Sequence, residues 1–314
     1  MENLYNFPYL CIMKSKLRDA IIILFAIHIL SSCGNPVPDD YIETILLEAL
    51  LIVDNPIKDI RLTRTLPLTE EYYYGNALIK NASIFIYEGE NEIKLKFIEY
   101  DSANIKKSGY YYDDTNYLVK PNTKYKLKAI LSNGKEITGS TTTPHKIEWT
   151  KKMADIIPYP DDTLNLPAYE GAQSEWTKND NKNSIFIYSV TCLDTLHYGK
   201  YLDIPTDDSN RRIRIRNHSN NNNQTQRPAE VTINSASILP KATLNWNFCR
   251  WFGSHSLKIY VPDKNYEQWF MYYLMLPNFN IKSYSVEGAI GYFGSAAMIE
   301  DTFFLRKNKQ MESK

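Results

Sequence analysis

The residues whose types predict chemistry most directly lie near the N-terminus, in Leu30-Ser-Ser-Cys33. A basic flank, Lys14-Ser-Lys-Leu-Arg18, and an apolar run, Ala20–Leu30, precede them. About eleven residues at roughly 1.5 Å each cover about half of a ~30 Å hydrocarbon core, which is too short for a membrane-spanning helix. Small residues before a cysteine favour a cleavable export signal, with a diacylglycerol attached to the Cys33 thiol. The alternative is an ordinary signal peptide, or a buried core helix, with a chance cysteine.

We therefore predict a lipoprotein signal peptide over residues 1–33. Met13 is the suspected true start, because residues 1–12 precede the basic flank and contain Pro8 and Cys11. Residues 34–40 are acidic and interrupted by prolines, and such a segment is typical of a tether. The predicted location is the outer membrane, held by the lipid anchor, with the folded part surface-exposed or periplasm-facing.

Side chains that catalyse hydrolysis or bind metals do not stand at the necessary spacing. Three adjacent acidic pairs occur, Asp113-Asp114, Asp161-Asp162 and Asp207-Asp208. Neighbours in a strand or turn point apart or into solvent, so we expect solvated turns rather than the opposed carboxylates of a glycosidase. The histidines beyond the signal, His145, His197, His218 and His255, are scattered singly, without metal-ligand spacing. We predict no catalytic residue, no metal and no cofactor.

Two patterns are candidate ligand or partner surfaces. Arg212, Arg214 and Arg216 would lie on one face of a strand, where they could dock an acidic partner or a lipid phosphate, or simply keep an edge strand solvated. Tyr72, Tyr73 and Tyr74 stand in a predicted loop, where aromatic rings could stack on a glycan or peptide ligand. Tyr110–Tyr112, Trp246 and Trp251 have the same alternatives, a stacking surface or half-buried packing.

Composition limits the class of protein. The 36 basic and 36 acidic residues balance, which argues against a nucleic-acid partner. The chain has 24 tyrosines and 12 glycines, a bias that favours strands. Cys192 and Cys249 are the cysteines beyond Cys33, and an envelope location would permit a disulfide between them. Two separate buried thiols are the alternative.

The pattern from residue 41 to residue 144 predicts a β-sandwich, because short alternating strands follow one another with turn signals between them. Examples are the apolar run Ile45–Val53, the alternating Ala82–Tyr87 and Ile93–Phe97, and the strand Lys124–Ile130 before the hairpin signal Ser132-Asn-Gly-Lys135.

Residues 145–306 predict a second β-rich domain, followed by a tail over 307–314. Ser184–Val190 is its clearest strand, and Gly288–Gly294 and Thr302–Leu305 are expected to be closing strands, with turn geometry explaining the glycines of the first. Residues 263–276 predict a helix, because Asp263 can cap it and Tyr266, Phe270, Tyr273 and Leu274 share one side. The fold class is therefore mainly β, with two immunoglobulin-like or fibronectin-like sandwich modules and one short C-terminal helix.

The order of these pieces resembles a family of Bacteroidetes cell-envelope lipoproteins, the domain of unknown function DUF4249. The resemblance rests on Ile60–Thr65, Asn81–Tyr87, Gly109–Tyr111, Lys120–Leu127, Thr141–Pro144, the Tyr266–Leu276 helix and Gly291–Gly294. The chain departs from the family by a short connection between Leu276 and Ile281. The resemblance implies an envelope lipoprotein, often encoded beside TonB-dependent receptors, with no established activity.

From the signal, the strand pattern and this resemblance we expect a non-catalytic outer-membrane lipoprotein that assists a TonB-dependent receptor or presents its ligand. Two alternatives remain: an adhesive or structural envelope protein, and an envelope glycan hydrolase whose site has no recognisable motif.

Overall fold

A computed structural model describes residues 41–102, 108–159, 170–178, 185–193, 231–245, 248–249, 251–275 and 284–306. The chain divides into two units. The first contains residues 1–43 and 66–71, and the second contains residues 44–65 and 72–314. Every element named below lies in the second unit. The predicted signal peptide, tether and tail and the row Arg212, Arg214 and Arg216 lie outside the described residues and stay predictions.

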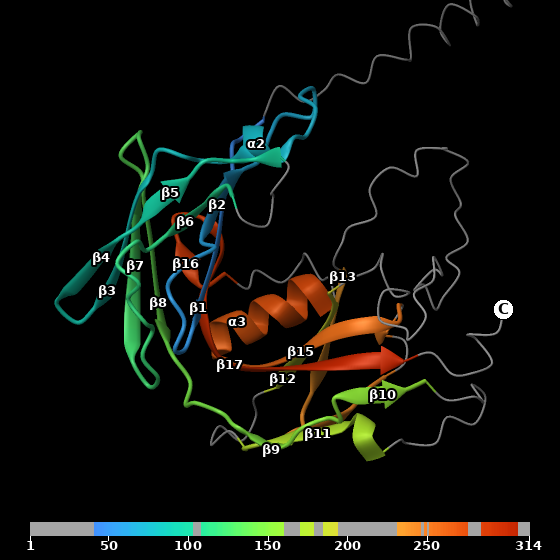
Figure 1. The fold of residues 1–314 in the computed structure, drawn as a ribbon. Helices are drawn as coiled ribbons and strands as arrows, with labels where there is room; N and C mark the ends of the chain where they lie inside the picture. The colour runs from blue at the N-terminus through green and yellow to red at the C-terminus, as the bar shows by residue number, and fades with distance from the viewer. Residues whose placement is uncertain are drawn as a thin grey trace, which may run out of the picture. The chain divides into compact units, whose positions relative to one another are not determined.

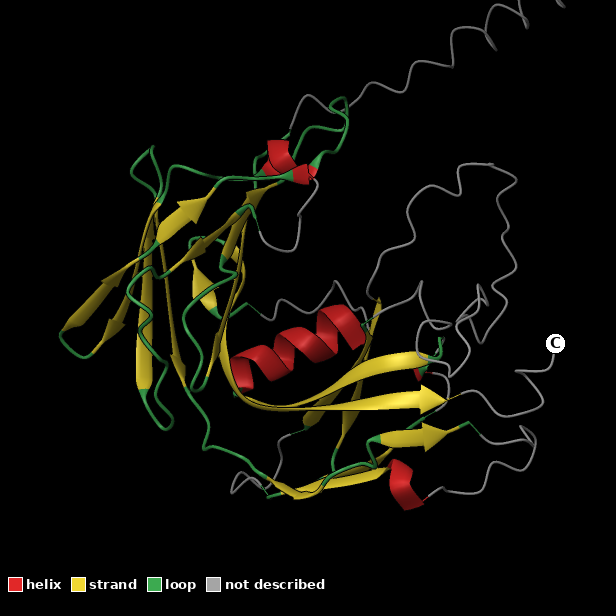
Figure 2. Ribbon diagram, in the orientation of Figure 1, coloured by secondary structure: helices red, strands yellow, loops and turns green. Residues whose placement is uncertain are grey.

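The described part is mainly β, with several sheets, sandwich-like layers and one short C-terminal helix, as predicted (Figures 1 and 2). The strands are β1 (Ile45–Ile52), β2 (Arg61–Arg64), β3 (Ser83–Glu88), β4 (Asn91–Lys94), β5 (Lys96–Ile98), β6 (Tyr110–Tyr112), β7 (Lys124–Ile130), β8 (Glu136–Thr142), β9 (Trp149–Lys151), β10 (Ile156–Pro158), β11 (Gln173–Trp176), β12 (Phe186–Cys192), β13 (Val231–Ser237), β14 (Lys241–Thr243), β15 (Gly253–Pro262), β16 (Val286–Glu287) and β17 (Ile290–Arg306). The helical segments are α2 (Tyr74–Ala77), the 3-10 turn η2 (Glu170–Ala172), α3 (Lys264–Trp269) and the π-helix η5 (Phe270–Met275).

The 17-residue strand β17 organises the largest sheet. This sheet has seven strands in the order β13-β12-β15-β17-β1-β2, and β10 also pairs with β17. The first part of β17 runs parallel to β1, and the later part runs antiparallel to β15. The sequence predicted two closing strands here. A single strand replaces them because Ala296, in the small-residue stretch between them, pairs with Ile52 of β1 and with Pro262 of β15.

Gly291 lies inside β17 rather than in the turn that the sequence suggested. Its φ is 113°, and a Cβ at this position would stand 2.0 Å from the carbonyl oxygen of Leu47. Glycine therefore permits the close parallel approach of β17 to β1, because any side chain would collide with the backbone of the neighbouring strand.

A five-stranded sheet follows the order β16-β8-β7-β3-β4, and β5 and β6 form a separate two-stranded ladder. The hairpin predicted at Ser132–Lys135 is confirmed, and β3 and β4 form another. Residues 88–91 turn β3 into β4 with Gly89 at φ 57°, and Gly134 at φ 81° turns β7 into β8. Both are left-handed conformations that glycine adopts without steric cost.

Two hydrophobic clusters of buried side chains hold these sheets together. The first collects mainly residues before position 140, such as Leu47, Ile86 and Tyr125, and the second collects mainly residues after it, such as Trp176, Val190 and Ile259. β17 contributes Phe293 to the first cluster and other residues to the second. β1 pairs with β17 and β16 pairs with β8, so strands cross the boundary predicted at residue 144.

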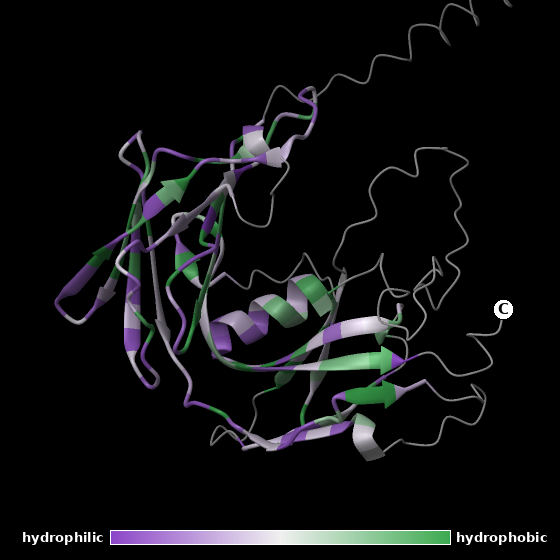
Figure 3. Ribbon diagram, in the orientation of Figure 1, coloured by the Kyte–Doolittle hydropathy of each residue, from purple (hydrophilic) through white to green (hydrophobic). Residues whose placement is uncertain are grey.

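The C-terminal helical segment starts where the sequence predicted. Asp263 is the N-cap of α3, and its Oδ1 accepts a hydrogen bond from the Tyr266 backbone N–H at 3.0 Å. After Trp269 the segment continues as the π-helix η5. Figure 3 shows that the start of α3 is hydrophilic and that the residues farther along the segment are more hydrophobic. Among the described residues, no helix is both long enough and apolar enough to cross a membrane.

Candidate functional site

The three predicted surface tyrosines do not share one environment. Tyr72 and Tyr73 are 70% and 46% exposed just before α2. Tyr74 is half-buried as the first residue of α2, and its hydroxyl accepts a hydrogen bond from Nη1 of Arg61 at 2.8 Å. The ring of Tyr100 packs edge-on against Tyr73 and Tyr74, with centroids 5.6 and 5.5 Å away. Tyr74 therefore belongs to a built cluster, whereas Tyr72 is a solvated ring.

Arg61 of β2 is the cation of this cluster, and sequence reasoning did not single it out. Its guanidinium carbon lies 5.6 Å from the ring centroid of Tyr74 and 5.9 Å from that of Tyr110. Its Nε donates to Oδ1 of Asp59 at 2.8 Å, and Nη2 lies 2.6 Å from the same oxygen. A guanidinium held flat by rings and a carboxylate keeps a fixed orientation.

Glu48 stands beside Arg61 in the sheet. In the register it lies opposite Arg61 of β2 on one side and opposite Tyr292 of β17 on the other. Burial raises the pKa of the Glu48 carboxyl, the charge of Arg61 partly opposes this rise, and Asp59 adds to it. Among the described residues, none donates a hydrogen bond to this partly buried carboxylate. A carboxylate held in such a position favours a partner that brings donors of its own.

Tyrosine rings of β17 and α3 complete the surroundings of Glu48. The rings of Tyr266 and Tyr292 have centroids 5.4 Å apart. Burial raises the pKa of Tyr266 to about 12, with the charge of Glu48 contributing. Burial also holds the pKa of Tyr292 well above its usual value, with smaller contributions from Tyr266 and Glu48. We call Glu48, Arg61, Tyr74, Tyr266 and Tyr292 the Glu48 cluster.

An aromatic stack ties α3 and η5 to the sheet next to the Glu48 cluster. The Trp269 ring lies between Tyr273 and Tyr292, with centroids 4.2 and 5.3 Å away. Tyr284 stacks on Tyr273 and is 39% exposed. Gly294 allows this packing, because a Cβ there would stand 2.8 Å from Cβ of Tyr266. The stack fixes the position of Tyr266 and Tyr292 and ends in a ring open to solvent.

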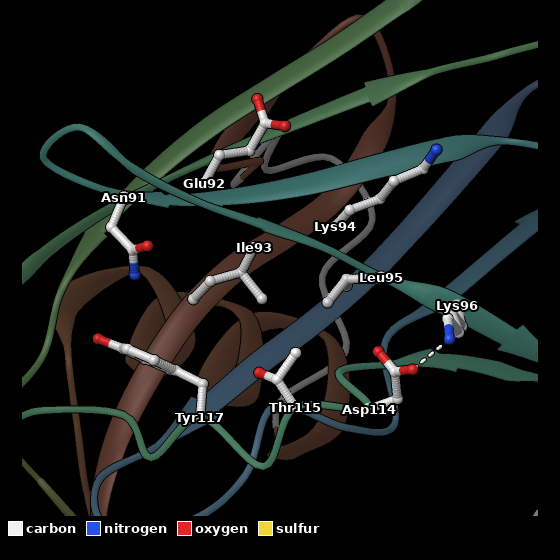
Figure 4. Close-up of a pocket in the computed structure, with 9 residues that line it drawn as sticks. All are labelled: Asn91, Glu92, Ile93, Lys94, Leu95, Lys96, Asp114, Thr115 and Tyr117. Carbon is white, nitrogen blue, oxygen red and sulfur yellow. Dashed lines mark hydrogen bonds and ion pairs between the residues drawn. The ribbon is translucent and has the colours of Figure 1, made fainter.

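A separate groove lies beside β4 (Figure 4). Its volume is about 650 Å³, and one wall is β4 while the other is the loop that follows β6. The lining residues are Asn91, Glu92, Ile93, Lys94, Leu95, Lys96, Asp114, Thr115 and Tyr117. An ion pair between Lys96 and Asp114 closes one end, drawn as a dashed line in Figure 4.

Asp113 makes the loop wall of this groove rigid, and the expectation that it is a solvated turn residue is wrong. Its side chain is buried, and its carboxylate accepts hydrogen bonds from Thr115 N at 3.0 Å, Thr115 Oγ1 at 2.8 Å and Tyr117 N at 2.7 Å. The Tyr117 hydroxyl donates to Oε2 of Glu88 at 2.7 Å. Asp113 can be buried because every acceptor position has a local donor.

The remaining residues predicted from the sequence belong neither to the Glu48 cluster nor to the groove beside β4. Cys192 and Cys249 are both buried, and the disulfide between them stays a prediction. Trp251 is buried, and Trp246 lies outside the described residues, as does Cys33. His255 is buried against Phe303 with ring centroids 5.1 Å apart. Groups of three or more possible metal ligands do not occur among the described residues.

The fold and the Glu48 cluster define a multi-sheet β protein with a fixed arrangement of aromatic rings around one carboxylate and one guanidinium. The family model described as "Domain of unknown function (DUF4249)" matches residues 35–300, so the chain belongs to this family, which its sequence motifs predicted. A search of curated proteins gives no match.

Proposed function

We propose that the protein is a non-catalytic outer-membrane lipoprotein of the Bacteroidetes envelope, which binds a glycan at the Glu48 cluster and presents it to a TonB-dependent receptor. The observation that carries the ligand-binding part is the half-buried Glu48 carboxylate, which no described residue satisfies although rings and a guanidinium surround it.

The chemistry of the cluster suits a polyhydroxylated ligand. A carboxylate accepts hydrogen bonds from neighbouring hydroxyls, and a guanidinium donates to ring or hydroxyl oxygens. The part-exposed rings of Tyr74 and Tyr266 offer apolar surface to a sugar, and the buried ring of Tyr292 packs behind Tyr266. The Tyr266 hydroxyl is protonated at neutral pH, as in any tyrosine with an ordinary pKa, and can donate a hydrogen bond.

A binding role fits the charges of the cluster better than a catalytic one. A glycosidase needs two carboxylates on opposite sides of the scissile bond. The carboxylate of Asp59 lies beside the Glu48 cluster and acts on the Glu48 pKa, but it is engaged by two nitrogens of Arg61. Glu48 is therefore a single acceptor for a ligand. One carboxylate can orient a sugar by accepting hydrogen bonds, but it lacks the second carboxylate that hydrolysis needs.

The role beside a receptor rests on the sequence. The lipid-anchor motif at Cys33 would hold the protein at the membrane, and the family resemblance implies a genomic association with TonB-dependent receptors. Anchoring raises the effective concentration of the two proteins for each other, so even a weak contact would be occupied in the membrane plane.

In-cell crosslinking tests the receptor role. The tagged protein is crosslinked in living cells of the organism that encodes it, solubilised in detergent, recovered and examined by mass spectrometry, with Cys33→Ser as a matched control that lacks the anchor. We expect a TonB-dependent receptor with the wild-type chain and much less with the control. Recovery of the protein itself or of no partner would contradict the receptor role and favour the adhesive alternative.

A further inference from the structure

The groove beside β4 has the geometry of an open strand position. In the ladder of β3 and β4, the Leu95 N–H donates to the Ile84 carbonyl at 2.9 Å, and Ile93 lies opposite Ile86. Main-chain groups of alternate residues point to the same neighbour, so those of Glu92 and Lys94 point away from β3. Both residues line the groove, so their main-chain donors and acceptors face it.

The same edge is already used as a strand-pairing site farther along the chain. Lys96 of β5 lies opposite Tyr112 of β6. An antiparallel β6 that continued straight would next cover Lys94. Instead, the Asp113 N–H donates to the Ile57 carbonyl at 2.8 Å, and the chain turns away. The groove is therefore the continuation of the path of β6 along the sheet edge, left open by the turn at Asp113.

The walls of the groove determine what would fit. Thr115 and Tyr117 stand across from β4 on the loop that Asp113 holds, as Figure 4 shows. A groove bounded on its far side by a loop suits one extended segment, which would pair about 4.8 Å from β4, better than a second folded sheet. The groove carries two acidic and two basic side chains, Glu92, Asp114, Lys94 and Lys96, so it selects against neither sign of charge.

We propose that this groove binds an extended segment of a partner polypeptide, which adds to the sheet as a strand along β4. The main-chain groups of Glu92 and Lys94 provide the hydrogen bonds, and the part-exposed ring of Tyr117 provides an apolar contact. The charged side chains of β4 discourage pairing with another sheet edge, while the groove accepts one flexible strand. This site is independent of the Glu48 cluster and of the lipid anchor.

The probe is a library of random heptapeptides displayed on phage, selected on the purified full-length chain in detergent. We expect enriched peptides with alternating apolar residues and without proline at alternate positions. One enriched peptide is then synthesised with a fluorophore for anisotropy titration. On binding it should slow hydrogen–deuterium exchange at the amides of Glu92 and Lys94, which a side-chain contact elsewhere would leave unchanged.

A matched pair of variants separates main-chain from side-chain recognition. Lys94→Pro removes the outward N–H but no bond to β3, and proline is tolerated at such edge positions. Lys94→Ala removes the charge and keeps the N–H. We expect the Kd of the peptide to rise at least tenfold in Lys94→Pro and to stay within twofold in Lys94→Ala. Thr115→Trp, which fills the groove without changing β4, should also weaken binding tenfold.

Several results would overturn this proposal. They are a selection that enriches no peptide, equal losses in Lys94→Pro and Lys94→Ala, or unchanged binding in Lys94→Pro and Thr115→Trp. A concentration-dependent dimer that Lys94→Pro abolishes would replace the partner segment with a second copy of the chain. Glu48→Gln should bind the peptide with the wild-type Kd. The peptide result can therefore be interpreted even if the Glu48 cluster binds no glycan.

Discussion

Asp113 is a buried carboxylate and Glu48 a partly buried one, and their hydrogen bonding differs. Asp113 receives hydrogen bonds from two backbone N–H groups and one hydroxyl within four residues of itself. Glu48 receives none from the described residues and lies among rings. A buried carboxylate with local donors holds a loop in place, whereas a partly buried one without them leaves its oxygens to water or to a ligand. The difference gives Asp113 a structural role and is the basis of the binding role proposed for Glu48.

The largest expected effect tests the scaffold under the Glu48 cluster. Gly291→Ala should lower the free energy of unfolding by about 3 kcal/mol or more, because its Cβ would stand 2.0 Å from the Leu47 carbonyl oxygen at φ 113°. Gly89→Ala is the matched control: its φ is 57° and no atom lies within 4 Å of the added Cβ, so a loss of about 1 kcal/mol is expected. Similar losses in urea unfolding of the two variants would contradict the close approach of β1 and β17.

The second-largest expected effect tests the structural role of Asp113. Asp113→Ala should cost about 2 kcal/mol, because Thr115 N and Tyr117 N lose their acceptor in a buried loop. The neighbouring Asp114→Ala removes an exposed ion pair with Lys96 and should change stability by about 0.5 kcal/mol or less. Equal effects in chemical denaturation would show that Asp113 is not the residue that holds the loop.

A third buried titratable group gives a pH test of the same reasoning. Burial lowers the pKa of His255 to about 4, although the hydrogen bond with the Gly253 carbonyl acts to raise this pKa. The unfolded chain therefore binds a proton at a higher pH than the folded one, so stability falls as the pH drops below about 6.5 toward 4. The loss between pH 7 and pH 5 should be roughly 1–2 kcal/mol.

His255→Phe keeps the stacking on Phe303 and should remove this part of the pH dependence of the melting temperature. An unchanged slope in the variant would mean that His255 is charged or solvated in the folded protein.

The smallest effect concerns Glu48 and has the opposite sign. Its folded pKa is raised, so the folded chain holds a proton at a pH where the unfolded chain has released it, and stability declines as the pH rises through that range. Glu48→Gln should therefore be more stable than wild type near pH 7, on the order of 0.5 kcal/mol, with the gain disappearing in acid. A loss of stability at pH 7 would instead make Glu48 a structural residue like Asp113.

The local elements were predictable because their causes are local. The strand β1 alternates buried and partly buried side chains along ILLEALLI. The N-cap Asp263 accepts a hydrogen bond from the backbone N–H of Tyr266, only three residues later. Parallel pairing of β1 with β17 was not predictable from either segment. It joins residues such as Leu47 and Gly291, and its register depends on a backbone approach that only the folded chain reveals.

The Glu48 cluster could be predicted only in part. Tyr74 was identified in the sequence as part of a tyrosine run. Arg61 reaches Glu48 through the pairing of β2 with β1, and Tyr266 and Tyr292 reach it through α3 and β17. One signal was present: Glu48 is the single charged residue in the apolar run ILLEALLI. A lone charge in a buried strand needs a partner, and its pairing with Arg61 across β1 and β2 is a property of the register.

The most direct test of the central claim is a glycan-array measurement with three labelled proteins: wild type, Glu48→Gln, and Glu136→Gln as a control for loss of a glutamate in an exposed ion pair with Lys128. We predict that wild type and Glu136→Gln bind the same glycans, and that Glu48→Gln binds them at least tenfold more weakly while remaining folded. Equal binding by all three proteins, or no binding by any of them, would contradict the assignment of the Glu48 cluster as a glycan site.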